Sequence, residues 1–484
     1  MPWNPRGRFA ASLGLLAGVA IAALFVLPVS AGQAPGGAAP GNEPVTFTKD
    51  IAPILQRSCQ GCHHSDGVGP MSLTTYEEVR PFARSMKLKT GLRGKPGSMP
   101  PWFVEKNIGI QRFKNDFSLT DDEIQKIAKW TDSGAPMGNP ADMPAPLTFA
   151  DAETWKLGQP DLLVKTPTVT LKASSPDWWG PIGEVPSGLT EDRYVKSVEY
   201  KEVTQSVPNS DGRKTVGSRF IFHHLCWGAG DSPEQDPAFI ENFPCHEVGR
   251  NGDVFDPEAP RLLKAGTKME LRSSHLHSNG KDTKSYIEMG FRLYPKDYQP
   301  KKKVVRLGLF GNSMNLDIEG MQANQHFEAF TVLPENAKII GFEPHMHAAG
   351  VRMCLDAISG AGMMVETLNC VGYDHSWVRV YTYEDDATPL LPKGTILRIT
   401  GYFDNTPSNR NVADPRNWSG LGHRSIDNMM NNLGEVVLLS DSEFKQAMLD
   451  RRAKLHLSEG QTLVGCPLCG SVKPVTATAG NNPQ

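Results

Sequence analysis

The chain has 484 residues, of which 39% are hydrophobic and 21% are charged, and its formal net charge is −3. This composition is typical of a globular protein and excludes wholesale disorder. Because acidic and basic residues nearly balance, we expect no nucleic acid and no acidic membrane surface as a partner. The 46 glycines and 38 prolines favour short strands and turns over long helices.

Residues 1–31 have the layout of a secretory signal peptide. Two arginines precede an apolar run from Phe9 to Val29, and the small residues Ser30 and Ala31 follow it. The run is also long enough for an uncleaved anchor, but the proline and the small residues at its end favour cleavage. We therefore predict an exported, periplasmic protein that has no membrane span after signal cleavage and whose thiols form disulfides or bind a cofactor.

Two segments rich in small residues and proline, 32–44 and 139–158, are predicted to be linkers around residues 45–138. Apolar residues at helical spacing, and a capping box that runs from Thr120 to Glu123, predict that the enclosed segment is helical. The sequence therefore favours a small all-α domain at 45–138.

This helical segment contains the motif C-x-x-C-H, formed by Cys59, Cys62 and His63. Two thiols at this spacing can form thioethers with both vinyl groups of a haem, and the histidine that follows reaches the iron. Met99, on a loop flanked by prolines, is the predicted sixth ligand, so we expect one covalent haem c that carries electrons and leaves no open position on its iron. The alternative thioether ligands are Met71, Met86 and Met137.

From residue 159 to about 440, short runs of alternating apolar and polar residues recur between turn residues. Many short strands at such spacing predict antiparallel sandwiches, and the length suits two of them better than one. We therefore predict a multidomain chain. It would consist of a small all-α cytochrome c domain, two tandem all-β sandwiches at 159–312 and 313–446, and a tail at 447–484.

Six of the 13 histidines form three tight pairs within this β-rich part: His223 and His224, His275 and His277, and His345 and His347. Residues at positions i and i+2 of a strand project from one face, so His345 and His347 can hold one metal ion. The adjacent His223 and His224 would diverge in a regular strand, and they need a strand end or a bulge to share an ion. For His64, His246, His326, His375, His423 and His456 we expect structural roles.

Six stretches of the β-rich part resemble, in the same order, the type II copper monooxygenases, a family that includes peptidylglycine α-hydroxylating monooxygenase and dopamine β-monooxygenase. They are PDLLVKTP (160–167), FIFHHLCW (220–227), HLHSNGK (275–281), EPHMHAAG (343–350), LPKGTILRITGYFDNT (391–406) and GHRSIDNMMNN (422–432). The front segment, with its CQGCHH and MPPWF runs, is similar to the cytochrome c module that precedes such domains in bacterial proteins.

The resemblance implies two copper sites on two jelly-roll-like sandwiches, separated by an open cleft. The ligands of the first copper would be His223, His224 and His275, with His277 in reserve. The ligands of the second, catalytic copper would be His345, His347 and Met429, with Met430 next to it. A thioether ligand selects copper over zinc, whereas the histidines without it could equally hold zinc.

On this resemblance we predict a copper-dependent monooxygenase that hydroxylates a C–H bond of an organic substrate with O₂. A periplasmic electron donor would reduce it through the tethered haem. Glu343 stands where the peptide-amidating enzyme has an arginine that binds the substrate carboxylate, so a peptide ending in glycine is not the expected substrate. The alternatives are a haem–copper electron carrier and a copper-binding or delivery protein, both without substrate chemistry.

The remaining cysteines lie close together in pairs along the chain. In an oxidising compartment, Cys226 with Cys245 and Cys354 with Cys370 are predicted to form local disulfides beside the metal ligands. Cys466 and Cys469 form a C-x-x-C in the tail, which is either a further disulfide or a thiol site for redox chemistry or copper transfer.

Overall fold

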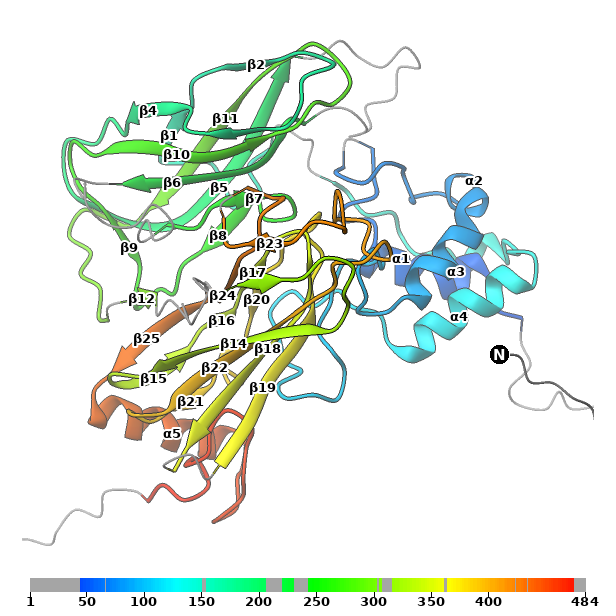
Figure 1. The fold of residues 1–484 in the computed structure, drawn as a ribbon. Helices are drawn as coiled ribbons and strands as arrows, with labels where there is room; N and C mark the ends of the chain where they lie inside the picture. The colour runs from blue at the N-terminus through cyan, green and yellow to red at the C-terminus, as the bar shows by residue number, and fades with distance from the viewer. Residues whose placement is uncertain are drawn as a thin grey trace, which may run out of the picture. The chain divides into compact units, whose positions relative to one another are not determined.

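The computed structural model describes residues 44–65, 67–149, 154–205, 220–229, 243–302, 304–306, 316–360, 364–422, 424–432 and 434–473. The predicted signal peptide (1–31) and all but the last residue of the first linker lie outside these ranges. Residues Val45–Gln484 form one compact unit (Figure 1). Within the described ranges, none of the helices combines the length and the apolar character needed to cross a membrane.

Short helices alternate with turns and loops within residues 45–138. They are η1 (Phe47–Ile51), α1 (Ala52–Ser58), α2 (Tyr76–Val79), η2 (Arg80–Phe82), α3 (Ala83–Gly91) and α4 (Asp121–Asp132), and η3 (Pro140–Asp142) follows them. Their small core contains Phe47 and Trp130, whose rings are 6.1 Å apart. The predicted capping box is confirmed, because the hydroxyl of Thr120 accepts the N–H of Glu123 while the Glu123 carboxylate accepts the N–H of Thr120.

The predicted fold class, which began with a small all-α cytochrome c domain, is wrong. The protein is mostly β-sheet, with 34% strand against 15% helix, and α1 to α4 have only 7, 4, 9 and 12 residues. The connection between α3 and α4 does not pack on these helices alone. Its side chains Trp102, Ile110 and Phe113 are buried in a hydrophobic core that is otherwise formed by residues 316–436. The apolar side chains of this turn-rich connection thus find their core among the strands.

The first β-region, residues 162–293, consists of two antiparallel sheets. One sheet contains β1 (Leu162–Lys165), β2 (Val169–Leu171), β5 (Arg193–Gln205), β8 (Gly252–Val254), β9 (Arg261–Leu263) and β11 (Thr283–Leu293). The other contains β3 (Trp178–Gly180), β4 (Gly183–Pro186), β6 (Phe222–Ala229), β7 (His246–Glu247) and β10 (Lys268–Leu276). Both sheets contribute to one hydrophobic core, in which the ring of Trp227 lies 4.8 Å from Phe243 and 5.8 Å from Phe291.

The second β-region, residues 304–439, contains two four-stranded sheets. The first has β14 (Gln325–Val332), β22 (Ile396–Phe403), β18 (Gly350–Ser359) and β19 (Met364–Gly372). The second has β12 (Val304–Arg306), β25 (Glu435–Leu439), β15 (Asn336–Ile339) and β21 (Leu390–Leu391). Three two-stranded ladders complete it: β13 (Asp317–Ile318) with β23 (Ser419–Gly420), β16 (Gly341–Phe342) with β20 (Tyr381–Thr382), and β17 (Pro344–Met346) with β24 (Met430–Asn432).

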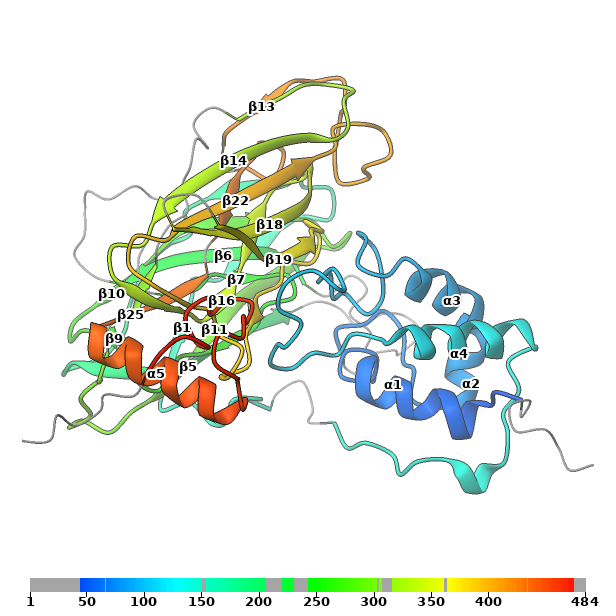
Figure 2. The ribbon, with the colours of Figure 1, turned by 90° about the horizontal axis from the view of Figure 1, so that it is seen from below.

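A C-terminal helix, α5 (Asp441–Lys454), follows the last strand and lies apart from α1 to α4 (Figure 2). Its side chains Phe444 and Met448 share a small core with the strand residues Leu390 and Val437, and both tail cysteines belong to the same core. The tail therefore packs on the second β-region.

Buried ion pairs connect the two β-regions. Arg250 forms an ion pair with Asp253 of the first β-region and another with Glu343 of the second. All three side chains are at least 85% buried. Arg261 and Glu435 form a second pair across the same boundary. Buried charges need such partners, so these pairs fix how the two β-regions meet. The predicted domain boundaries stay predictions, because everything from residue 45 onward belongs to one compact unit.

Candidate metal centres

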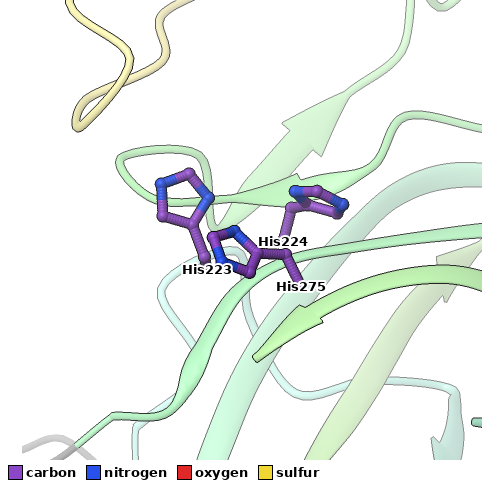
Figure 3. A group of neighbouring side chains, drawn as sticks. All are labelled: His223, His224 and His275. Carbon is purple, nitrogen blue, oxygen red and sulfur yellow. The ribbon is translucent and has the colours of Figure 1, made fainter. Parts of the chain in front are cut away.

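A first histidine cluster lies where β6 meets β10. His224 pairs with His275 across the ladder, and the register then shifts so that Leu276 pairs with Phe222. The shift leaves His223 as the extra residue of a β-bulge, which is the local feature that two adjacent histidines need to share an ion. Nitrogen atoms of His223, His224 and His275 all lie within 4.8 Å of one another (Figure 3). His277 does not belong to this group.

Neighbouring side chains hold His275 in place. Its Nε2 lies 3.0 Å from a carboxylate oxygen of Asp177, its Nδ1 lies 3.1 Å from the hydroxyl of Ser425, and its ring stacks on Trp179 at 4.7 Å. A carboxylate on one nitrogen orients an imidazole for metal binding through the other, here Nδ1, which would exchange the Ser425 hydroxyl for the ion. Ser425 belongs to the second β-region, so both β-regions contribute to the surroundings of this cluster.

The imidazoles of the first cluster are kept neutral. Burial, followed by the neighbouring histidines, lowers the pKa of His223 strongly, and burial lowers the pKa of His224 to about 3. Burial also lowers the pKa of His275. The buried Nδ1 of His223 has no hydrogen-bond partner among the described residues. Neutral imidazoles with an unpartnered nitrogen are what a metal ion requires of its ligands.

The second cluster is set by the ladder of β17 and β24. Met346 pairs with Met430, and both side chains are fully buried in the hydrophobic core. Because neighbours along a strand face opposite sides, His345 projects away from that core. His347 and Met429 each lie one residue beyond this ladder, where continued strand alternation would direct Met429 to the side of His345 and His347. This register supports Met429, not Met430, as the thioether beside the two histidines.

The rings of His345 and His347 are 5.5 Å apart. Nδ1 of His345 lies 3.4 Å from a carboxylate oxygen of Glu247, which is on β7 of the first β-region. Burial alone would lower the pKa of His345, but the Glu247 carboxylate raises it overall. Burial would raise the pKa of Glu247, but His345 and Arg250 bring it down to about 2. Glu247 is therefore an anion that holds His345 in one orientation.

A seventh histidine, His375, lies between the two clusters. Its ring centroid is 5.1 Å from that of His223 and 5.6 Å from that of His347. Both of its ring nitrogens are buried and have no hydrogen-bond partner among the described residues. The sequence alone predicts a structural role for His375, because this residue is not part of a histidine pair. Its place in the loop that directly follows the strand of Cys370 was the one signal available.

The C-x-x-C-H motif forms a turn at the end of α1. The N–H groups of Cys62 and His63 both donate to the carbonyl of Cys59, at 3.1 and 2.9 Å. Nδ1 of His63 lies 3.1 Å from the carbonyl oxygen of Met71, which leaves Nε2 for another partner. A Cβ atom at Gly69 would lie 2.4 Å from this imidazole, so only glycine lets the loop approach so closely.

The two thiols of the motif are free, whereas the other six cysteines form disulfides. Burial, followed by the neighbouring Cys62, raises the pKa of Cys59 to about 12. Met99, the predicted sixth ligand, is 42% exposed. Two free thiols beside an oriented histidine suit covalent haem attachment.

The predicted disulfides Cys226–Cys245 and Cys354–Cys370 are confirmed. The first joins the strand of the paired histidines to the segment that precedes β7, and the second links opposite residues of β18 and β19. Cys466 and Cys469 also form a disulfide. Glu343 is only 2% exposed, and its ion pair with Arg250 engages it within the protein.

A cavity of about 980 Å³ lies beside the second cluster. Ala348 and Ala349 line it directly after His347, and Asp427 and Asn428 line it directly before Met429. Its apolar lining includes Trp418, Leu421 and Ile426. A small organic molecule could therefore lie next to the second cluster.

No protein-family model matches the chain, and no curated protein matches it.

Proposed function

We propose that this protein is an exported, copper-dependent monooxygenase that hydroxylates a C–H bond of an organic substrate with O₂. The observation that carries the proposal is the pairing of two donor sets. A three-histidine cluster lies near a cluster of two histidines and a methionine, and a cavity lies beside the second cluster. Thioether and imidazole donors together favour copper.

The two donor sets fit copper on the observations above. His223, His224 and His275 would hold one ion, and His345, His347 and Met429 the other. Copper there would supply one-electron steps and the activation of O₂. Hydroxylation of R–H by O₂ consumes two electrons and two protons and yields R–OH and water, so the protein needs a route for electrons.

The chain's own residues position the reaction. Asp177 and Glu247 orient His275 and His345, and buried surroundings keep the other imidazoles neutral. The apolar side chains Trp418 and Ile426, which are 63% and 51% exposed, would contact the hydrocarbon part of a substrate in the cavity. Because the cavity also contains carboxylate and amide groups, the favoured substrate is a small molecule with both apolar and polar parts.

Electrons would enter through a haem c held by Cys59, Cys62 and His63. Segment 374–381 connects this motif with the histidines. It begins beside His375, and its Arg379 is close enough to Cys62 to oppose the burial that raises the pKa of that thiol. The Arg379 guanidinium also lies over the rings of Trp102 and Phe117, at 5.6 and 4.9 Å. These contacts of Arg379, four residues along the chain from His375, support electron transfer from a periplasmic donor through the haem to the copper sites.

The test combines metal analysis with activity. Protein exported to a periplasm that makes c-type cytochromes should contain one covalent haem and two coppers per chain, and Cys59→Ala should lose the covalent haem. Reduced protein should consume O₂ only when an organic substrate is added, with one hydroxylated product per O₂. Stoichiometric zinc without copper would sink the proposal, and so would the absence of substrate-dependent O₂ uptake across a broad substrate screen.

A further inference from the structure

His375 differs from every other histidine in the described part of the chain, because both of its ring nitrogens are buried without a hydrogen-bond partner. A buried polar nitrogen without a partner carries an energetic cost, and two on one ring are rare unless a ligand satisfies them.

The position of the ring matches that of a shared ligand. Its centroid is 5.1 Å from that of His223 and 5.6 Å from that of His347. The rings of His345 and His347, two proposed ligands of one ion, are separated by a similar 5.5 Å. Imidazoles on one ion lie roughly this far apart when each metal–nitrogen bond is about 2 Å. His375 therefore lies at ligand spacing from both clusters.

The backbone on both sides of His375 is tied to the two clusters. Before it, the hydroxyl of Tyr373 donates to the carbonyl of Met346, the residue between His345 and His347. After it, the N–H of Val378 donates to Val248 at 3.0 Å, and the N–H of Val248 donates to the carbonyl of His223 at 2.9 Å.

The carboxylate of Asp374 fixes the turn that carries His375. It accepts the hydroxyl of Ser376 at 2.6 Å and the N–H of Gly97 at 2.8 Å. Hydrogen bonds of the residues before and after His375 restrict the backbone of this loop. The loop therefore holds an otherwise unpartnered imidazole at the junction of the two clusters.

We propose that His375 is a metal ligand that bridges the two clusters, with one ring nitrogen bound to each ion. This inference rests on the proposed copper function and changes its geometry, because the two ions become a coupled pair instead of separate sites across an open cleft. Binding through both nitrogens releases the remaining ring proton to solvent. The pair would exchange electrons directly, without a step through open solvent.

The test is electron paramagnetic resonance of the full-length protein loaded with two Cu²⁺ ions per chain, compared with His375→Gln. A bridging imidazolate couples the spins of the two Cu²⁺ ions. The wild type should therefore show far fewer detectable spins per chain than the number of copper ions it contains. The variant should recover close to two spins per chain. Its affinity for the second copper should fall roughly 10-fold or more, since even indirect supports of a metal site cost 10–100-fold. His326→Gln, at an exposed position on β14, is the control and should behave as the wild type.

The outcomes separate the bridge from the function. Two uncoupled copper signals in the wild type that His375→Gln leaves unchanged would overturn the bridge and leave the monooxygenase proposal standing. The bridge would also be overturned if the wild type shows no coupling and His375→Gln alters only one of the two copper signals. A protein that takes up no copper would overturn both. Circular dichroism of the variant, together with its retained haem, checks that the fold is preserved.

Discussion

The two histidine clusters are built differently. The first depends on a bulge that places three imidazoles together, and its surroundings are an aspartate, a serine and a tryptophan. The second depends on strand alternation, which separates His345 and His347 from the core methionines and aligns them with Met429. The lining of the cavity includes chain neighbours of His347 and Met429 and no residue of the first cluster. The contrast suggests that one cluster stores an electron and the other meets the substrate.

The largest expected effect comes from Met429→Ala. It removes the soft donor of the second cluster, so copper should be lost there while the haem and the first copper remain. Substrate-dependent O₂ uptake should fall to background. Metal content and oxygen-electrode measurements check this.

The matched control for Met429 is Met430→Leu, which keeps the volume of a fully buried core side chain. It should retain activity. Full activity in Met429→Ala together with a collapse in Met430→Leu would show that the register has been assigned to the wrong methionine.

His223→Ala should give the opposite metal pattern. It removes one of three imidazoles from the first cluster, so the chain should bind one copper, at the second site. Stopped-flow reduction by an electron donor should then show reduction of the haem without the rapid onward electron transfer to the first copper that is expected in the wild type. Retention of both coppers would contradict the ligand set that Figure 3 displays.

Glu247→Gln tests how the first β-region supports the second cluster. The change preserves size but removes the charge that orients His345. Copper affinity at the second site should fall about 10–100-fold, because orienting partners of ligand histidines have effects of that size. Competition with a Cu⁺ chelator measures it. Equal affinity in variant and wild type would mean that Glu247 is only a packed carboxylate.

The two histidine clusters also show which features could be predicted from the sequence and which could not. Strand alternation at His345-x-His347, the bulge at His223 and His224, and the two local disulfides follow from nearest-neighbour rules. The segment between α3 and α4 was assigned to a helical domain because its neighbours are helical. Trp102 and Phe113 nevertheless pack among strands more than 200 residues away. His375 was missed for the same reason, since only the tertiary fold brings an isolated histidine between the two clusters.

The last prediction concerns the stability of the fold and not the metal sites. Glu202 is a buried carboxyl group next to the start of β6, the strand of the first cluster. It accepts the backbone N–H groups of Ile221 and Phe222 at 2.8 and 3.1 Å. Burial raises its pKa from 4.5 to about 7, despite these hydrogen bonds.

Because the folded state keeps the proton on Glu202 up to a higher pH than the unfolded state, the unfolded chain binds fewer protons between about pH 4.5 and 7. Stability should therefore decline as the pH rises through this window and stay lower above it, by up to about 3 kcal/mol. Denaturant unfolding of the wild type at pH 5 and pH 8 should show that decline. Glu202→Gln should flatten it, and Glu328→Gln, at an exposed position on β14, should leave it unchanged. An unaltered pH slope in Glu202→Gln would show that Glu202 is already ionised in the folded protein, and that its backbone hydrogen bonds outweigh its burial.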